Sequence, residues 1–449
     1  PGLPQAQWTR SASAATPADL PAALLQLQQG LQGELGAVAA NRPWPAREVL
    51  TAIGRLESTA PAEGDVDALA QLAQSSVSSE LWWALLQSLD GVGRAAEATA
   101  VARRASEATE SAADSAGRRA HAYAQLLLGN FELAREELQV LITAAPGDPA
   151  LTLLKARAQA ELGDFQAAIA ELTELTADDQ RDIHAWYLLG KYSIQSGDAK
   201  RAVDDYLVRA QVLANRLDDV RMQANVGNAL GLGYRLLGQL AAAAERFESS
   251  FRIRQAIGDA RGQAASLRNL STVRSIQGDY AAAAGALSLA RSLVEPLGDP
   301  VAMADLVNDV GVLAEEQGDY RGALDAYRDA LRLRQAQGNL REIGQSQINV
   351  GFAYYQLGEF DNAQTYWQQA MASYQQADDR IGMVHARESL ALAETASGAW
   401  EQARGSFDHI LVESESLQMA EERSIAQAGL AELDRLEGRM VSALDNAGK

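Results

Sequence analysis

Apolar residues recur at intervals of three and four over most of the chain, which is the spacing of one face of an α-helix. In residues 183–210, Trp186, Leu189 and Tyr206 follow this spacing, and a Gly-Asp pair at Gly197 interrupts it near the middle. Such a pair is typical of a tight turn between two helices. Each segment of this kind therefore predicts a first helix, a turn and a second helix, which we name helix A and helix B.

The predicted helix pair recurs with a fixed period. Six turn glycines are spaced 40 residues apart, at Gly238, Gly278, Gly318, Gly358, Gly398 and Gly438. A second series with the same spacing consists of Asp219, Asp259, Asp299, Asn339 and Asp379. Upstream, the spacing shortens to 34 residues at Gly129, Gly163 and Gly197. A constant period of this length indicates one supersecondary unit stacked into an array.

Three positions keep their character from copy to copy. With each unit counted so that Trp186 is its fourth residue, the eighth residue is small, as at Gly190, Gly311 and Gly351. An alanine lies five residues after the turn glycine. Small residues on both helices predict a close approach of helix A to helix B. The residue two after the turn glycine is aromatic in most copies, and we expect it to fill the gap between units, so that truncation to Ala costs about 3–5 kcal/mol. These aromatic residues are Phe131, Phe165, Tyr280, Tyr320, Phe360 and Trp400.

The order of these residues resembles the tetratricopeptide repeat, whose pattern is Trp-x2-Leu-Gly followed by Ala-x3-aromatic. Residues 183–210 carry it as Trp186, Leu189, Gly190, Ala202 and Tyr206. The resemblance covers at least residues 115–438, and Pro146 lies where the family places a helix-ending proline. It implies an all-α fold, a right-handed superhelical solenoid of stacked helix-turn-helix repeats with a concave inner wall.

The 40-residue copies are similar to the partner-of-Inscuteable class of polarity adaptors and to bacterial tetratricopeptide receptors and regulators. The Asn-Leu-Gly phrase of that class appears as Asn269-Leu270-Ser271 and Asn349-Val350-Gly351, and is altered at Asp309. We expect the six extra residues of the long copies to lengthen helix B and the loop after it. We expect the chain to begin with a linker or arm at residues 1–20, followed by an irregular helical region at residues 21–114 with a degenerate repeat at 79–112. Three repeats of the 34-residue type should follow at residues 115–223, and five of the 40-residue type at residues 224–423. The chain should end with a truncated repeat or cap at residues 424–449.

Composition narrows the classes of function. The 449 residues are 47% hydrophobic and 22% charged, which indicates a folded protein, and the net charge of −20 disfavours nucleic acid and anionic membrane surfaces. The absence of cysteine excludes disulfides and thiolate sites. No apolar run is long enough for a membrane span. Because the chain begins at Pro1, we expect a soluble part of a longer protein, either cytoplasmic or periplasmic. The sequence does not determine its oligomeric state.

Candidate catalytic chemistry is sparse. The glycines at Gly91 and Gly93 follow a helical pattern instead of a strand, so they predict a turn and not a dinucleotide site. The four histidines lack the spacing of a metal site, and Glu315-Glu316 reads better as a solvated acidic face than as an acid pair. We therefore expect no cofactor, no metal and no enzymatic activity.

The resemblance implies that helix A lines the inner wall with places two, five, six, nine, twelve and thirteen of each repeat, counted so that Trp186 is place four. These places lie opposite the packed places four, seven, eight and eleven. They supply the candidate binding residues Asn228, Arg235, Arg268, Asn269, Asn308, Asn349, Phe352, Tyr355 and His385.

Each residue type in this set has a chemical reason to bind. Asparagines can pair with a peptide backbone, arginines with a carboxylate, and the two aromatic rings can anchor apolar groups. His385 would provide a polar contact. Two interpretations of the asparagines stay open: contact with a peptide, or hydrogen bonds that only space the repeats.

Two functions agree with these patterns. The first is a non-catalytic scaffold that binds a peptide or an extended protein segment on the concave wall. The alternative is a sensory or regulatory domain of a larger signalling protein, such as a transmembrane kinase or a transcription regulator. The start at Pro1 and the irregular N-terminal region favour this alternative.

Overall fold

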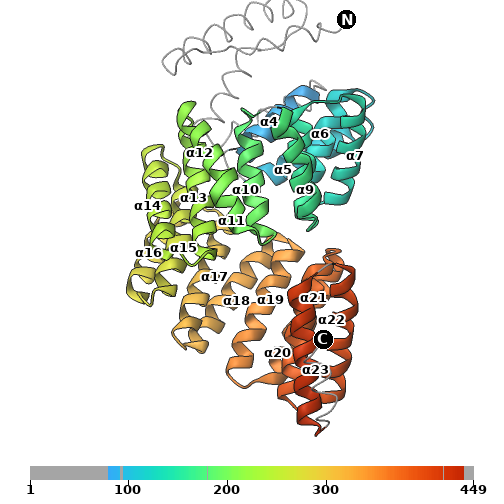
Figure 1. The fold of residues 1–449 in the computed structure, drawn as a ribbon, viewed down its shortest axis with the longest axis vertical. Helices are drawn as coiled ribbons and strands as arrows, with labels where there is room; N and C mark the ends of the chain where they lie inside the picture. The colour runs from blue at the N-terminus through green and yellow to red at the C-terminus, as the bar shows by residue number, and fades with distance from the viewer. Residues whose placement is uncertain (1–78, 92–94, 179, 418, 439–449) are drawn as a thin grey trace, which may run out of the picture. The chain divides into compact units, whose positions relative to one another are not determined.

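The computed structural model describes residues 79–91, 95–178, 180–417 and 419–438, and all regular structure within these ranges is helical. The described residues form a succession of helices (Figure 1), which divide into two compact units. Unit 1 extends to Leu237 and includes Ala256–Asp259, whereas unit 2 comprises Gly238–Gln255 and the residues from Ala260 onwards. The arm predicted at residues 1–20, and the N-terminal region as far as residue 78, lie outside the described residues.

Unit 1 is a stack of antiparallel helix pairs. Its A helices are α4 (Ser79–Gly91), α6 (Ser115–Leu127), α8 (Pro149–Glu161), α10 (Ile183–Gln195) and α13 (Val220–Leu236). Its B helices are α5 (Ala95–Thr109), α7 (Phe131–Ala144), α9 (Phe165–Asp178) and a composite helix of α11 (Ala199–Arg201), η3 (Ala202–Tyr206) and α12 (Leu207–Arg216).

Unit 2 continues the same alternation with longer helices. Its A helices are α15 (Ala260–Ile276), α17 (Pro300–Glu316), α19 (Leu340–Gln356), α21 (Arg380–Ala396) and α23 (Ala420–Leu436). Its B helices are α14 (Leu240–Ala256), α16 (Tyr280–Val294) with the short η4 (Glu295–Leu297), α18 (Tyr320–Gln337), α20 (Phe360–Gln376) and α22 (Trp400–Ser416). This arrangement confirms the predicted all-α solenoid of stacked helix pairs.

The long copies gain their extra residues in both helices. Helix A has 13 residues in α8 and 17 in α19, and helix B has 14 residues in α9 and 17 in α20. The loop to the next repeat becomes shorter, from residues 145–148 after α7 to residues 377–379 after α20. Helix B is longer, as expected, but the expectation that the loop after it is also longer was wrong. In the long copies, helix A begins about one turn before the first residue of the family motif. The sequence did not predict this start, because sequence pattern alone locates helix ends poorly.

A π-helical turn takes up a single extra residue where short copies give way to long ones. Left-handed turn residues lie 20 positions apart from Asp218 to Gly398, but Gly197 and Asp218 are 21 apart. Between them, η3 is a π-helix, whose turn holds more residues than an α-turn. Helix B of this copy therefore stays continuous and the repeats on either side keep their phase.

The turns of the long copies share one chemistry. A left-handed residue, usually glycine, precedes an Asp or Asn whose side chain accepts a backbone N–H of the following helix, as Asp299 does from Val301 and Ala302. The 40-residue Asp/Asn series is thus a series of helix-A caps, seen at Asp219, Asp299, Asn339 and Asp379. Asp218 and Asp378 occupy the left-handed position without being glycine.

The small positions bring the paired helices together as predicted. A Cβ placed on Gly311 would lie 2.6 Å from the ring of Tyr327, and one on Gly351 would lie 2.4 Å from Nε1 of Trp367. The alanines five after the turn glycine have no exposed surface from Ala134 to Ala403, and Ala443 lies outside the described residues. The aromatics two after the turn glycine are less enclosed than expected, because Tyr280 is 38% and Trp400 is 37% exposed. Truncation at these two positions is therefore expected to cost less than the core value.

Candidate functional site

Consecutive A helices contact one another directly. These contacts join α15 to α17, α19 to α21 and α21 to α23 in unit 2, and α4, α6, α8, α10 and α13 in sequence in unit 1. We call the surface formed by places two, five, six, nine, twelve and thirteen of these helices the A layer of each unit. It is the surface on which the sequence placed the binding residues.

The nine predicted residues fall on the A helices but in different units. Asn228 and Arg235 lie on α13 in unit 1. The other seven lie in unit 2, with Arg268 and Asn269 on α15, Asn308 on α17, Asn349, Phe352 and Tyr355 on α19, and His385 on α21. All except the exposed His385 are half-buried. The candidate site described below is therefore the A layer of unit 2.

Arg268 is engaged by carboxylates of its own chain. Its Nη1 donates to Oδ2 of Asp305 at 3.0 Å, and its Nε donates to Oδ2 of Asp309. Both aspartates lie on α17, the A helix of the next repeat. Loss of hydration opposes the charge of the guanidinium, but the two carboxylates outweigh it and raise the pKa of Arg268. The fork predicted for a ligand carboxylate thus joins two repeats in this structure.

Two of the predicted asparagines also bridge repeats. Nδ2 of Asn349 donates to Oδ1 of Asn308 at 2.7 Å, from α19 to α17, and Nε2 of Gln345 donates to Oδ1 of Asn349 at 3.3 Å. The hydrogen bond between the asparagines matches the spacing interpretation. It uses only part of the hydrogen-bonding capacity of the two amides, because each offers two donors and one acceptor oxygen.

The same register recurs along unit 2. Arg268–Asp309, Asn308–Asn349 and Ser275–Glu316 each join a residue to the one 41 positions later. His385 and Glu422 are joined over 37 positions, with Nε2 and Oε1 3.2 Å apart. The two steps differ by four residues, about one helical turn, so one side chain can reach residues on consecutive turns of the next A helix, as Arg268 reaches Asp305 and Asp309. We call these side-chain pairs the polar rungs.

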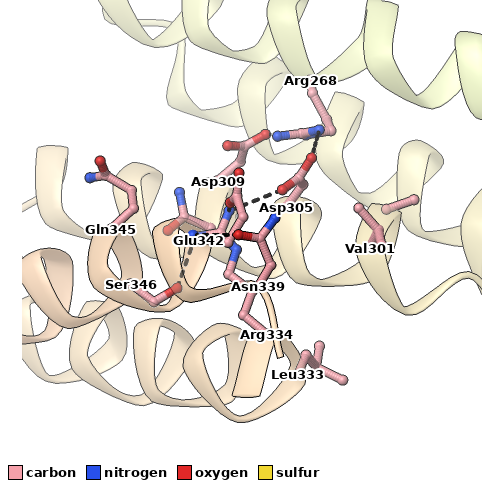
Figure 2. A network of polar contacts seen from close by, with 12 residues as sticks. Arg268, Val301, Asp305, Asp309, Leu333, Arg334, Asn339, Glu342, Gln345 and Ser346 are labelled. Atoms are coloured by element: carbon pink, nitrogen blue, oxygen red, sulfur yellow. Dashed lines mark hydrogen bonds and ion pairs between the residues drawn. The ribbon is translucent and has the colours of Figure 1, made fainter. Parts of the chain in front are cut away.

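A buried arginine from helix B strengthens the stack beneath the rungs (Figure 2). Arg334 of α18 donates through Nη1 to Oγ of Ser346 at 2.8 Å and through Nη2 to Oδ1 of Asp305 at 3.0 Å. Its Nη2 also lies 3.1 Å from Oε2 of Glu342. Asp305 therefore lies between Arg268 and Arg334, and three successive repeats share one charged network.

The sequence analysis missed Arg334, although a signal for it was present. Arg254 occupies the same register two repeats earlier, and its Nη1 donates to Oγ of Ser266 at 2.8 Å, as Arg334 does to Ser346. An arginine and a serine twelve residues apart, repeated after 80 residues, would have identified the pair. The repeat pattern predicted binding residues only on helix A, and these arginines lie on helix B.

An aromatic patch adjoins the polar rungs on α19. The ring of Tyr355 lies 6.5 Å from that of Phe352, 5.4 Å from that of Phe360 and 6.0 Å from that of Trp367, measured between centroids. Trp367 is fully buried and its Nε1 donates to the carbonyl oxygen of Ile348 at 3.0 Å. Phe352 and Tyr355 stay half-exposed on this rigid support, so they offer apolar surface that is already oriented.

Place nine forms an apolar row across four A helices of unit 2. Its members are Thr272, Val312, Phe352 and Leu392, of which the first three are half-buried and Leu392 is 43% exposed. The row contains one member of the aromatic patch and runs beside the polar rungs. The A layer of unit 2 thus combines oriented amides with accessible apolar side chains.

Burial perturbs the pKa of two carboxylates of the A layer. Burial raises the pKa of Glu315, while the hydroxyl of Tyr327 donates to its Oε2 at 2.8 Å and opposes the shift. Burial likewise raises the pKa of Glu388, opposed by His385 and increased by Glu422. Within residues 79–91, 95–178, 180–417 and 419–438, no group of three or more His, Cys, Asp or Glu side chains is placed to hold a metal ion.

Across the part of the chain that the structure describes, every helix is too short or too polar to cross a membrane.

Comparison with known sequences identifies the repeat in both units. Two family models described as tetratricopeptide repeat match residues 125–192 and residues 342–411. Repeats of this family serve as protein-interaction or regulatory sensor modules. A search of curated proteins gave no match.

Three solved structures match the chain at low identity. The chain is 16% identical to a Rap protein solved in complex with Competence and Sporulation Factor, with a TM-score of 0.50, over 74% of this chain and 95% of that one. It is 18% identical to a signal transduction ATPase with a tetratricopeptide repeat sensor from Pyrococcus horikoshii (TM-score 0.48, 78% of this chain and 52% of that one). BtubC from P. vanneervenii is 21% identical (TM-score 0.38, 48% of this chain and 91% of that one).

The chain matches about half of the length of the Pyrococcus horikoshii protein.

Both family matches fall on helix pairs of the array, and the same unit with its small positions and capped turns recurs between and beyond them. The chain contains tetratricopeptide repeats, matched at residues 125–192 and 342–411.

Proposed function

We propose that the chain is a non-catalytic interaction module in which the A layer of unit 2 binds an extended segment of a peptide or protein partner. The observation that carries the proposal is the apolar row at place nine, with half-exposed Phe352 and exposed Leu392, beside the polar rungs. An extended segment needs both features: donors and acceptors for its backbone, and apolar surface for alternate side chains.

The rungs orient the amides for this task. Asn308 accepts from Asn349, which fixes the planes of both side chains, while the amide groups keep further donors. Each net hydrogen bond to a ligand contributes about 0.5–1.5 kcal/mol, so several A helices are needed for useful affinity. Spacing the repeats and contacting a ligand are in this way two uses of one set of side chains.

Arg268 has a supporting role in this proposal. Its guanidinium is held by Asp305 and Asp309, and it would have to leave them to pair with a ligand carboxylate. We therefore assign primary ligand contact to Gln345, Phe352 and Leu392, which are exposed or half-exposed on adjacent helices. His385 is also exposed, but its ring is paired with Glu422.

A sensory or regulatory domain of a larger signalling protein would use the same surface. Binding would then be read out by an attached domain through a change in the stacking of repeats. The Rap protein of similar fold was solved with a bound factor, which supports a ligand-binding use of this architecture.

The test uses the immobilised full chain and a pool of random synthetic dodecapeptides. Peptides that are retained would be sequenced, and the best of them titrated against variants. Leu392→Ser and Gln345→Ala are each expected to weaken binding about tenfold, which corresponds to about 1.4 kcal/mol. Both positions are exposed, so the fold should be unaffected.

The matched control is Val412→Ser on helix B. Val412 is 68% exposed on α22, so the substitution removes similar apolar surface outside the A layer. Binding by this variant should equal that of the unmodified chain. Equal losses for Val412→Ser and Leu392→Ser, or no loss for either A-layer variant, would place the ligand elsewhere.

A further inference from the structure

Two adjacent carboxylates of the A layer, Glu315 and Glu316 of α17, have no part in the binding described above. They occupy places twelve and thirteen of their repeat. The corresponding pairs in the other long copies contain no acidic residue: Arg235-Leu236, Ser275-Ile276, Tyr355-Gln356, Thr395-Ala396 and Arg435-Leu436. The negative charge at these two places is therefore particular to one repeat and is not a requirement of the stacking.

The partners of both carboxylates are neutral hydroxyls. Oε2 of Glu315 accepts from the hydroxyl of Tyr327 at 2.8 Å, and Oε2 of Glu316 accepts from the hydroxyl of Ser275. By contrast, Asp305 of the same helix is paired with two arginines. Glu315 is half-buried and Glu316 is exposed. In the part of the chain that the structure describes, no arginine or lysine is paired with either of them.

The support of Glu315 is also the support of the aromatic patch. Tyr327, whose hydroxyl holds Glu315, is 2% exposed and belongs to one hydrophobic cluster with the buried Trp367. Phe352 and Tyr355 pack against that cluster. The carboxylate and the two half-exposed rings are therefore held on one rigid base.

The register of the polar rungs places Glu315 opposite these rings. In the rung of Arg268, one side chain of α15 reaches the residues 37 and 41 positions later on α17. The same two steps from Glu315 lead to Phe352 and Gln356 on α19, and Tyr355 lies between them in the sequence. The carboxylate and the aromatic patch thus meet across one repeat boundary.

Carboxylates beside aromatic rings suit a cationic group. A guanidinium or ammonium pairs with the carboxylates and is attracted to the face of a ring. Such a group would also relieve a cost in the chain itself, because burial and the charge of Glu316 both disfavour the ionised form of Glu315 and raise its pKa. An anionic or purely apolar group would gain neither interaction.

We propose that Glu315, Glu316, Phe352 and Tyr355 form a subsite for a cationic side chain of the bound segment, with arginine as the best fit. Glu315 accepts from its guanidinium, Glu316 adds negative charge, and the two rings cover its apolar stem. This inference rests on the proposed function, because the cation belongs to the segment that the A layer of unit 2 binds. The net charge of −20 adds long-range attraction for a basic partner.

The test compares two pools of synthetic dodecapeptides on the immobilised full chain. Both pools have flanks randomised over uncharged residues and one fixed central residue, which is arginine in one pool and citrulline in the other. Citrulline has a similar length and a planar head group that forms hydrogen bonds, but it has no charge. The apparent Kd of the arginine pool is expected to be about five- to tenfold lower.

Two variants and a control locate the preference for arginine. Glu315→Gln keeps an oxygen that can accept from the hydroxyl of Tyr327, so the fold should be unaffected. It should reduce the preference to about twofold or less, while the citrulline pool binds as before. Tyr355→Leu keeps apolar volume but removes a ring face, and should reduce the preference about two- to threefold. The control is Glu245→Gln, which removes an exposed carboxylate from helix B (α14) and should leave the preference unchanged.

The outcomes separate the cationic subsite from the binding of a segment. Equal retention of the two pools by the unmodified chain overturns the subsite but leaves segment binding standing. A preference that Glu315→Gln and Glu245→Gln lower equally also overturns it, because net charge then accounts for the preference. So does a preference that stays unchanged in both Glu315→Gln and Tyr355→Leu. Retention of neither pool contradicts the proposed function and this inference together.

Discussion

Asn349 donates its side-chain Nδ2 to Oδ1 of Asn308 at 2.7 Å, across the boundary between two successive repeats. If this bond stabilises the stack, Asn308→Ala and Asn349→Ala should each lower the free energy of unfolding by about 0.5–1.5 kcal/mol. The double variant should lose less than the sum of the two, because the shared bond is removed only once. Urea unfolding followed by circular dichroism measures all three values. Strict additivity would show that the bond does not couple the repeats.

Arg334 and Asp305 form a more enclosed link between repeats. Asp305→Ala removes a carboxylate shared by Arg334 and Arg268, and it leaves the buried guanidinium of Arg334 partly uncompensated. We expect a loss of about 2–3 kcal/mol, less than for a fully buried pair because Asp305 is partly exposed. Asp305→Ala combined with Arg334→Met should recover part of the loss.

The control for this prediction is Asp329→Ala, which breaks the exposed pair of Asp329 with Arg332 within one helix. Its effect should stay below about 0.5 kcal/mol. Because alanine is a better helix former than aspartate, a loss in Asp329→Ala as large as that in Asp305→Ala would mean that the buried network contributes no more than an exposed ion pair.

Gly351 is required by the ring that packs on it. A Cβ at this position would lie 2.4 Å from Nε1 of Trp367, whose side chain is 1% exposed and cannot move aside. Gly351→Ala is expected to destabilise by about 1–3 kcal/mol. Gly285→Ala is the matched control, since that helical glycine has open space around it, and the change should stabilise by about 0.5–1 kcal/mol. Thermal unfolding of both variants distinguishes steric from propensity effects.

Asp378 has a left-handed backbone with φ of +51°, at a position where Gly338 and Gly298 serve in other repeats. Asp378→Gly should stabilise by roughly 0.5 kcal/mol because glycine adopts this conformation without strain. Gly338→Ala should destabilise by about 1 kcal/mol for the converse reason. Denaturant midpoints measure both. A loss of stability in Asp378→Gly would show that unfolded-state entropy outweighs the relief of strain.

Glu315 should make folding less favourable as pH rises. Burial raises its folded-state pKa above the unfolded value, so the folded chain binds more protons between the two values. The contribution is most favourable below the unfolded pKa of about 4.3 and is lost as pH rises through the folded pKa. Glu315→Gln removes this dependence, so its stability relative to the unmodified chain should increase from pH 4 to pH 7. A constant difference over that range would contradict the assignment.

The periodic residues predicted most of the fold because each acts locally. From spacing alone, Gly311 and Gly351 predicted the close approach of paired helices, and the turn glycines predicted the turns. The distribution of the extra residues was mispredicted. A helix can be extended by a turn at its N-terminus without any change in the motif, as at Val220. In the sequence, only the capping residue that precedes the helix indicates where the helix begins.

The candidate site was predicted less completely. Helical periodicity correctly placed Asn308, Asn349 and Phe352 on the A helices, since that depends on angle around a single helix. It did not show that Arg268 is already paired with Asp309, because that contact depends on the offset between successive helices.

By itself, the sequence determined the repeat, its period, the helix pairs and the residues that pack them, because these follow from interactions within about one repeat. Tertiary structure alone decided which polar side chains meet across repeats and that Asp305 lies between Arg268 and Arg334. The physical reason is that the register between stacked helices arises from the packing of whole surfaces, to which every repeat contributes.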